Sequence, residues 1–420
     1  MKIKTKKLPF TKVLEIKKPK HKYPKKPNIL FRTIIRIAAL PDLWATRFKY
    51  TKTRMDKAGD GPYLILMNHS SFIDLEIASR IFYPMPYGIV CTSDGFVGKE
   101  WLMRNIGCIP TQKFVTDVTL IKDLIYAIQK KKISVLMYPE ASYTFDGTAT
   151  PLPRRLGVLI KKLGVPVLTV ITDGAFLRDP LYNGLQKRKV KVSAHLHCLF
   201  TKEDIESLSV EELDKQLDEA FSFDNFAAQY DKRIKVNEKF RADGLNRILY
   251  RCAACNTEGK MVGEGTFITC KHCGKKYYLN EYGRLEAQNG ETEFAHIPDW
   301  YNWQRECVRN EIIGGTYKLE TDVDIAVLRD FKAIYKVGSG RLVHTADGFE
   351  LEGCDGELKY HHSPLASYGL YSDYFWYEIG DVICIGNKDM LYYCFPKIKG
   401  DIVAKTRIAA EEIYKLKKEK

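Results

Sequence analysis

The hydrophobic positions between residues 61 and 200 follow two alternating patterns. Short apolar runs, typical of buried strands, occupy 63–67, 135–138, 165–172 and 190–199. Between them, apolar residues recur every three or four positions over 73–82, 119–131 and 156–163, which indicates helices. Strands separated by helices predict an α/β domain with a largely parallel sheet.

From about residue 294 the pattern changes to short alternating runs, at 333–337, 341–345, 349–352, 375–379, 381–385 and 390–395. A final helix over about 401–417 would place Ile402, Ala409, Ile413 and Leu416 on one side. Residues 294–420 are therefore expected to form an antiparallel β domain closed by a C-terminal helix. This outline is similar to pleckstrin-homology-like modules, which would imply a lipid- or peptide-binding role.

Basic residues are concentrated near the N-terminus. The 420 residues carry a net charge of +14, and residues 1–36 hold eleven Lys and two Arg against one Glu, leaving about +2 for the rest. Residues 1–27, rich in Lys and Pro, show no hydrophobic periodicity. We expect an extended, mobile arm that meets an anionic surface, either lipid head groups or nucleic acid.

The next segment, 29–40, reads as a basic amphipathic helix. Its apolar residues fall largely on one face, and Arg32 and Arg36 lie one turn apart on another. Such a helix can lie in a membrane interface, or it can pack on the following domain. The two interpretations are compatible, and both stay open.

Composition excludes several classes of protein. With 45% hydrophobic and 28% charged residues, the chain is neither wholly disordered nor fibrous. No stretch reaches the ~18 apolar residues of a spanning helix, and the N-terminus lacks the features of a secretory signal. Seven of the eleven cysteines are scattered singly, as in a reducing compartment. We expect a cytosolic protein.

The first candidate site directly follows the predicted strand 63–67, where His69 and Asp74 stand five positions apart. The turn after such a strand is where catalytic groups gather in α/β domains. Regular helix would turn the two residues about 140° apart, so they meet only if the loop stays non-helical to about Phe72. Asp74 would then fix the imidazole tautomer and leave Nε2 free to accept a proton. The alternative is a loop histidine beside a helix-start aspartate.

The second candidate lies where the strand 135–138 runs into Pro139 and Glu140. Because Pro139 cannot continue the ladder of hydrogen bonds, Glu140 would be held at the mouth of the strand. Taken alone, this stretch could equally be a surface turn.

Together these stretches resemble the lysophospholipid/glycerolipid acyltransferases of the 1-acylglycerol-3-phosphate type. His69 and Asp74 match the first block of that family, 98–100 and 106–113 the second, 138–140 the third and 164–168 the fourth. The resemblance covers roughly residues 40–215. It implies a mixed, largely parallel sheet flanked by helices, in an acyltransferase domain of residues 28–235 that includes the amphipathic helix.

The resemblance also implies the chemistry. His69 would be the general base for the hydroxyl of a lysolipid acceptor, and Asp74 would orient it. The hydroxyl would attack an acyl thioester, either acyl-CoA or acyl-carrier-protein. A thioester is already activated, so the step requires no metal.

Substrate-binding roles follow from the same resemblance. Lys113 stands where the family usually has an arginine that contacts the acceptor phosphate. Glu140, beside the backbone of the Pro139 turn, would position the glycerol part. Val165 and Pro166 would line the acyl channel.

One block departs from the family pattern. After the glutamate the family usually continues Gly-Thr-Arg-Ser, whereas residues 141–144 are Ala-Ser-Tyr-Thr. Neither Tyr143 nor Lys113 replaces the planar fork of an arginine, although Arg154 and Arg155 could supply charge from another direction. Acyl transfer is therefore the firmer expectation, and a phosphate-bearing acceptor the weaker one.

Four cysteines predict a metal site within residues 248–282. They form two C-x-x-C pairs, Cys252 with Cys255 and Cys270 with Cys273, separated by fourteen residues. Two such thiolate pairs suit structural Zn²⁺ in a zinc ribbon, and four sulfurs leave no open position for catalysis. His272 is expected to be a loop residue.

The sequence thus predicts an acyltransferase on the cytoplasmic face of an anionic membrane. A catalytically silent lipid-binding or scaffold protein with the same fold is the main alternative, because residues 141–144 are altered. Nucleic-acid binding is not expected, because residues 250–280 carry no dense basic stripe.

Overall fold

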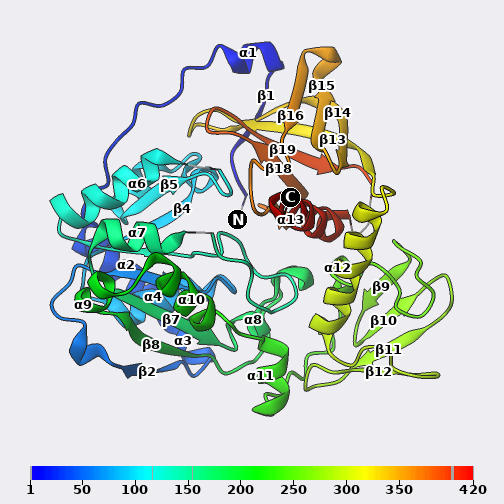
Figure 1. Ribbon diagram of the computed structural model, residues 1–420, viewed down its shortest axis with the longest axis horizontal. Coiled ribbons are helices and arrows are strands. Elements are labelled where there is room, and N and C mark those ends of the chain that lie inside the picture. Colours follow the sequence, from blue (N-terminus) through cyan, green and yellow to red (C-terminus); the bar gives the residue numbers. More distant parts are fainter. Residues whose placement is uncertain (1, 116, 154, 399–401, 420) are drawn as a thin grey trace.

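The computed structural model in Figure 1 describes residues 2–115, 117–153, 155–398 and 402–419. Within these ranges the strands form three sheets. The seven-stranded sheet and its helices lie at the left of Figure 1, a four-stranded sheet at the lower right, and an eight-stranded sheet at the top.

The seven-stranded sheet has the order β2-β8-β7-β3-β6-β4-β5. Its strands are β2 (Lys49–Thr53), β3 (Leu64–Met67), β4 (Tyr87–Thr92), β5 (Cys108–Thr111), β6 (Ser134–Met137), β7 (Val167–Asp173) and β8 (Ser193–Phe200). Neighbours are parallel except β7 and β8, which are antiparallel. The chain therefore contains a mixed α/β sheet, as expected.

Helices surround this sheet and cover both of its faces, except that α11 packs toward the small sheet that follows. They are α2 (Ile29–Ala38), α3 (Leu40–Ala45), α4 (Ile73–Phe82), α5 (Glu100–Asn105), α6 (Val118–Ile125), η3 (Tyr126–Lys130, a π-helix), α7 (Leu156–Leu163), α8 (Ala175–Arg178), α9 (Lys202–Ser207), α10 (Val210–Ala220) and α11 (Asn225–Asp231). Alternate residues of β3 point to opposite sides: Ile65 and Met67 join a buried cluster with α4, while Leu64 and Leu66 join another with α6 and α7. This alternation explains why β3 is apolar throughout.

A four-stranded antiparallel sheet follows, in the order β12-β11-β10-β9. Its strands are β9 (Met261–Glu264), β10 (Phe267–Cys270), β11 (Lys276–Leu279) and β12 (Leu285–Ala287).

The C-terminal part begins with a helix that the sequence did not indicate, α12 (Ile297–Ile313). Seven strands then form an antiparallel series in the order β16-β15-β14-β13-β19-β18-β17. They are β13 (Leu319–Leu328), β14 (Ile334–Thr345), β15 (Gly348–Gly353), β16 (Leu358–His362), β17 (Tyr371–Trp376), β18 (Gly380–Gly386) and β19 (Leu391–Pro396), and α13 (Ile402–Glu419) follows. The expected antiparallel strands and closing helix are present, and α12, β13 and β16 are additions to them.

The N-terminal segment is not the free arm that we expected. The strand β1 (Thr5–Lys7) pairs in parallel with β14, and the short helix α1 (Phe10–Leu14) buries Phe10 and Val13. Farther along, the ring of Tyr23 stacks on that of Tyr126 with centroids 4.4 Å apart. Elements this short contain too few apolar residues to produce a periodic pattern, so they could not be predicted from the sequence.

The three sheets share buried cores. One cluster contains Phe145 and Phe176 from the α/β part, Cys252 and Ile268 around the small sheet, and many residues of the C-terminal module. A second cluster joins Val97 of the α/β part to β13, β17, β18 and β19. The parts therefore pack against one another as a continuous body.

Candidate functional site

The α/β sheet brings the first two candidate motifs to the same edge. Strands β3 and β6 are parallel neighbours, and Leu66 pairs with Met137. His69 lies two residues beyond the end of β3, and Glu140 lies three residues beyond the end of β6. The two loops meet directly, because the backbone N–H of His69 donates to Glu140 Oε2 over 3.0 Å.

His69 and Asp74 face each other. Helix α4 begins at Ile73, so the loop before it is free to turn the imidazole back toward Asp74. His69 Nδ1 lies 3.0 Å from Asp74 Oδ2, which also accepts the amide hydrogens of Ser70 (2.8 Å) and Ser71 (3.1 Å). Among the described residues, His69 Nε2 has no hydrogen-bond partner, and 18% of the side chain stays exposed.

Burial sets the protonation of this pair. Burial lowers the pKa of His69 well below its ordinary value, and the positive charge of Lys113 lowers it further. Burial raises the pKa of Asp74 to about 7, although the amides of Ser70 and Ser71 oppose this rise. A neutral imidazole that donates its Nδ1 proton to Asp74 keeps Nε2 as a proton acceptor.

Two tyrosine rings enclose His69, and no sequence motif indicated this. Tyr138 stacks on the imidazole at a centroid distance of 4.0 Å and Tyr143 at 4.1 Å. Both tyrosines flank Glu140 in the sequence, within the stretch that resembles the third block of the family. Tyr143 occupies the position where the family usually has an arginine, and here it supplies an aromatic surface.

Both carboxylate oxygens of Glu140 accept hydrogen bonds from protein groups. It is 1% exposed, and its second oxygen, Oε1, accepts from both the backbone N–H (3.0 Å) and the hydroxyl (3.1 Å) of Thr150. Burial raises its pKa to about 7. In this structure Glu140 ties the His69 loop to the 141–150 loop, and Pro139 is buried beside it.

Lys113 follows β5 at the same edge of the sheet. Its ammonium lies over the ring of Tyr371, 4.5 Å from the centroid, so it faces the C-terminal module. Burial lowers its pKa, while the negative charges of Asp373 and Asp94 oppose this.

The other predicted substrate contacts are not gathered around His69. Arg155 is exposed at the N-terminal end of α7, and Arg154 lies outside the described residues. Val165 and Pro166 precede β7, where the carbonyl of Pro166 accepts from the N–H of Leu64 at the start of β3. They therefore lie at the opposite edge of the sheet from His69.

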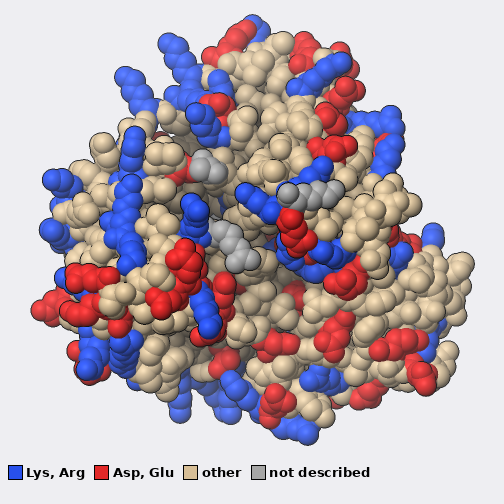
Figure 2. Space-filling view, in the orientation of Figure 1, with Lys and Arg blue, Asp and Glu red and all other residues tan. Residues whose placement is uncertain are grey.

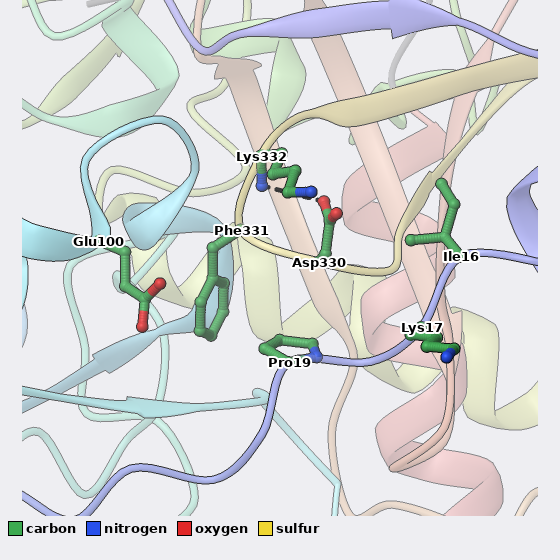
Figure 3. A pocket seen from close by; sticks show the side chains of 7 residues that line it. All are labelled: Ile16, Lys17, Pro19, Glu100, Asp330, Phe331 and Lys332. Atoms are coloured by element: carbon green, nitrogen blue, oxygen red, sulfur yellow. Dashed lines mark hydrogen bonds between the residues drawn. The ribbon is translucent and has the colours of Figure 1, made fainter.

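Two hollows lie away from the predicted catalytic pair. The one in Figure 3 has a volume of about 480 Å³ and is lined by Ile16, Lys17, Pro19, Glu100, Asp330, Phe331 and Lys332. Its wall includes the N-terminal segment, and Asp330 accepts the backbone N–H of Lys332. The other, of about 520 Å³, is lined by residues that include Arg247 and Phe375. None of the described candidate site residues lines either hollow.

The four paired cysteines come together beside the small sheet. Their sulfur atoms lie within 4.8 Å of one another, with Cys252 to Cys273 and Cys255 to Cys270 both at 3.8 Å. Four sulfurs each 2.3 Å from a tetrahedral Zn²⁺ would stand about 3.8 Å apart. Asn256 and Gly274, the residues that follow the two pairs, each have a positive φ. Each donates its N–H to the backbone carbonyl of the first cysteine of its pair. The cluster therefore has the spacing of a four-sulfur metal site.

Helix α2 turns its apolar side outward. Ile29, Leu30, Ile34 and Ile37 are each at least half exposed. Arg32 instead donates to the carbonyl of Pro84, and burial lowers the pKa of Arg36. Within the described ranges, no helix is both long enough and apolar enough to cross a membrane.

The comparisons with known proteins agree on one class. Residues 47–173 match the family model described as Acyltransferase. This stretch contains His69, Asp74, Lys113 and Glu140, and the match confirms the resemblance to acyltransferases drawn from the sequence.

Two known proteins to which part of the chain is similar are named as acyltransferases of the 1-acylglycerol-3-phosphate type. The chain is 26% identical over 176 residues to the chloroplastic 1-acyl-sn-glycerol-3-phosphate acyltransferase BAT2 of Brassica napus, which covers 39% of this chain and 50% of that protein. The chain thus spans about half the length of this curated relative. It is also similar to the crystal structure of the 1-acyl-sn-glycerophosphate (LPA) acyltransferase PlsC from Thermotoga maritima, with 18% identity, a TM-score of 0.35, and coverage of 45% of this chain and 76% of that chain.

Proposed function

We propose that this protein is an O-acyltransferase that moves a fatty acyl group from an acyl thioester to a hydroxyl of a lysolipid, such as a 1-acylglycerol-3-phosphate. The observation that carries the proposal is the His69–Asp74 pair, with Nδ1 and Oδ2 3.0 Å apart, inside the stretch that matches the acyltransferase family.

The geometry supports a general-base mechanism. His69 Nε2 takes the proton of the acceptor hydroxyl while the oxygen attacks the thioester carbonyl. The tetrahedral intermediate then collapses, the C–S bond breaks, and the imidazolium returns its proton to the leaving thiolate. Asp74 holds the tautomer and stabilises the transient imidazolium, and a positioned base of this kind contributes about 10²–10⁴-fold.

The acceptor is proposed to approach from the side of Lys113, whose charge is felt at His69. Glu140 serves the acceptor site indirectly, since both of its oxygens already bind protein groups and hold the two loops together. Val165 and Pro166 serve the acyl chain only if it extends along the sheet to the opposite edge.

The exposed side of α2 supports membrane docking. Its outward-facing isoleucines and leucine are joined by Trp44 and Trp101, which are 73% and 68% exposed. Aromatic and aliphatic residues of this kind enter the boundary between head groups and acyl chains. Lysines of the N-terminal segment add attraction to an anionic leaflet, and Figure 2 shows Lys and Arg gathered along the upper left of the molecule, over α1 and α6. The cytoplasmic face is the side proposed.

Structural zinc is proposed for the four cysteines. Cys252 and Cys270 are buried, and Cys273 is exposed in the turn between β10 and β11. Zinc would hold the two C-x-x-C turns together and supply folding energy that so small a sheet lacks.

The test is mass spectrometry of the products formed from a mixed lysolipid pool and one isotope-labelled acyl-CoA. We expect a labelled diacyl product from the parent protein and at least a hundredfold less from His69→Ala. His195→Ala, which removes an exposed imidazole from β8, is the matched control and should keep the parent rate. If no thioester is consumed with any lysolipid of the pool, whether the donor is acyl-CoA or acyl-carrier-protein, the result would favour a catalytically silent scaffold protein. A His69→Ala variant as active as the parent would refute the base assignment.

A further inference from the structure

We propose that Arg407, on the C-terminal helix α13, is a positioning residue of the acyl-transfer site. It holds the turn at Ser142 and Tyr143 so that the Tyr143 ring stays on the His69 imidazole. This inference rests on the proposed function of His69, and it assigns to the C-terminal module a part in catalysis.

The turn that carries Tyr143 needs external support. Ala141 has a φ of +57°, a left-handed conformation that residues with a Cβ rarely adopt. Its N–H donates to the carbonyl of Tyr138, so the turn closes directly after β6. The Tyr143 ring then lies 4.1 Å from the His69 ring, centroid to centroid, at an interplanar angle of 30°.

Arg407 supplies that support from the other end of the chain. Its Nη2 donates to Ser142 Oγ over 2.9 Å, and its Nη1 donates to the carbonyl oxygen of Tyr143 over 3.2 Å. The guanidinium also lies 4.4 Å from the ring centroid of Phe145. The planar guanidinium thus donates hydrogen bonds to two consecutive residues of the turn. A lysine ammonium could not reproduce this pair of hydrogen bonds.

The guanidinium is itself fixed in place. Arg407 is 3% exposed, and its Nε donates to Glu411 one turn farther along α13. Glu411 also pairs with Arg305 of α12 over 2.8 Å. A buried chain of charges therefore runs from α12 through α13 to the turn beside His69.

The expected consequence is electrostatic. With Tyr143 in place, His69 is shielded on both ring faces and remains neutral at neutral pH. If the turn loosens, water reaches the imidazole and its pKa rises toward the ordinary 6.5. The titratable and charged groups that face His69 are Asp74 from α4, Lys113 after β5, and Tyr138, Glu140 and Tyr143 after β6.

The experiment measures kcat, KM and the pH profile of kcat/KM for Arg407→Lys and Arg407→Ala in the full chain. We expect kcat to fall about 10- to 100-fold in Arg407→Ala and less in Arg407→Lys, with KM nearly unchanged. The acid limb of kcat/KM should move to higher pH in both variants, and added guanidinium ion should partly restore Arg407→Ala. Tyr143→Ala should shift the limb in the same direction, and adding Arg407→Ala to it should cause little further change.

Arg305→Gln is the matched control. It breaks the same buried charge network without touching the turn, so it should lower the melting temperature and leave the acid limb where it is in the parent. An Arg407→Ala variant that melts earlier but keeps the parent kcat and pH profile would overturn the inference. A parent that shows no transfer activity would instead refute the proposed function, so the two failures are distinguishable.

Discussion

Burial raises the pKa of the carboxyl groups around His69, whereas hydrogen bonds to them lower it. Asp74 Oδ2 receives three donors, yet its Oδ1 is buried with no partner among the described residues. Glu140 is fully engaged through both oxygens. Desolvation prevails in both, because the pKa of each carboxyl is raised to about 7. The site therefore holds two carboxyl groups that titrate near neutral pH.

A stability prediction follows for Glu140→Gln. The raised folded-state pKa means that the unfolded chain releases this proton first as pH rises from about 4.5 to 7. The stability advantage of the parent over Glu140→Gln should therefore shrink with rising pH, by about 2 to 3 kcal/mol between pH 5 and pH 8. Urea unfolding of both proteins at the two pH values measures it.

Glu411→Gln provides a control in which the stability difference from the parent should depend on pH in the opposite direction. Ion pairing with Arg305 and Arg407 lowers the pKa of Glu411 although burial opposes it. The parent advantage over this variant should shrink as pH falls. A Glu140→Gln difference that grew with pH would contradict the first prediction.

The residues of the site were only partly predictable. The spacing of His69 and Asp74 specified the condition for their contact, and α4 begins at Ile73 as that condition required. The stacking of Tyr143 was not predictable, because it depends on Arg407, 264 residues away in the sequence. Val165 and Pro166 were assigned by resemblance, and the register of β3 and β7 places them at the far edge.

Several helices and strands could not be predicted from hydrophobic periodicity because of their amino-acid composition. The strand β2 (Lys49–Thr53) is a largely exposed edge strand whose residues, Tyr50 apart, are Lys and Thr, so it shows no apolar run. Strand β14 was anticipated as two runs because Gly338 and Gly340 interrupt its pattern, yet Gly340 sits where an added Cβ would lie 2.3 Å from the carbonyl oxygen of Glu352. Helix α12 has polar residues on much of its surface, so its sequence shows no clear apolar periodicity.

The outward face of α2 predicts membrane affinity that can be removed locally. The double variant Ile34→Glu and Ile37→Glu should bind anionic phosphatidylglycerol vesicles at least tenfold more weakly, because two exposed apolar side chains lose their burial in lipid. Vesicle co-sedimentation at physiological salt measures it. Val158→Glu with Val262→Glu changes the same charge at exposed positions elsewhere and should retain binding. Equal binding by both double variants would argue against α2 as the docking element.

At the scale of the whole molecule, the modules share one buried cluster. It contains Cys252 and Cys270 of the proposed zinc site together with Trp300 of α12 and Val403 of α13. Loss of metal should therefore destabilise more than the small sheet. The resemblance of the C-terminal strands and α13 to a pleckstrin-homology-like module stays a prediction.

The zinc prediction is close to one Zn²⁺ per chain in protein purified without chelator. Cys255→Ser should lose the metal and melt lower by on the order of 5 °C, since the site supplies folding energy. Elemental analysis and thermal unfolding measure the two effects. Cys307→Ser, a cysteine on α12 outside the cluster, should keep both the metal and the melting temperature. Metal-free parent protein would exclude the site.

The pairing of β1 with β14 also has a consequence for biosynthesis. Ribosomes add about 5–20 residues per second, so Thr5 is made roughly 15 to 65 seconds before its partner Ile334. During that interval the lysine-rich leading segment has no strand to join, and the turn beside His69 has not yet received its arginine. The nascent chain can therefore complete its α/β sheet well before its proposed catalytic site is assembled.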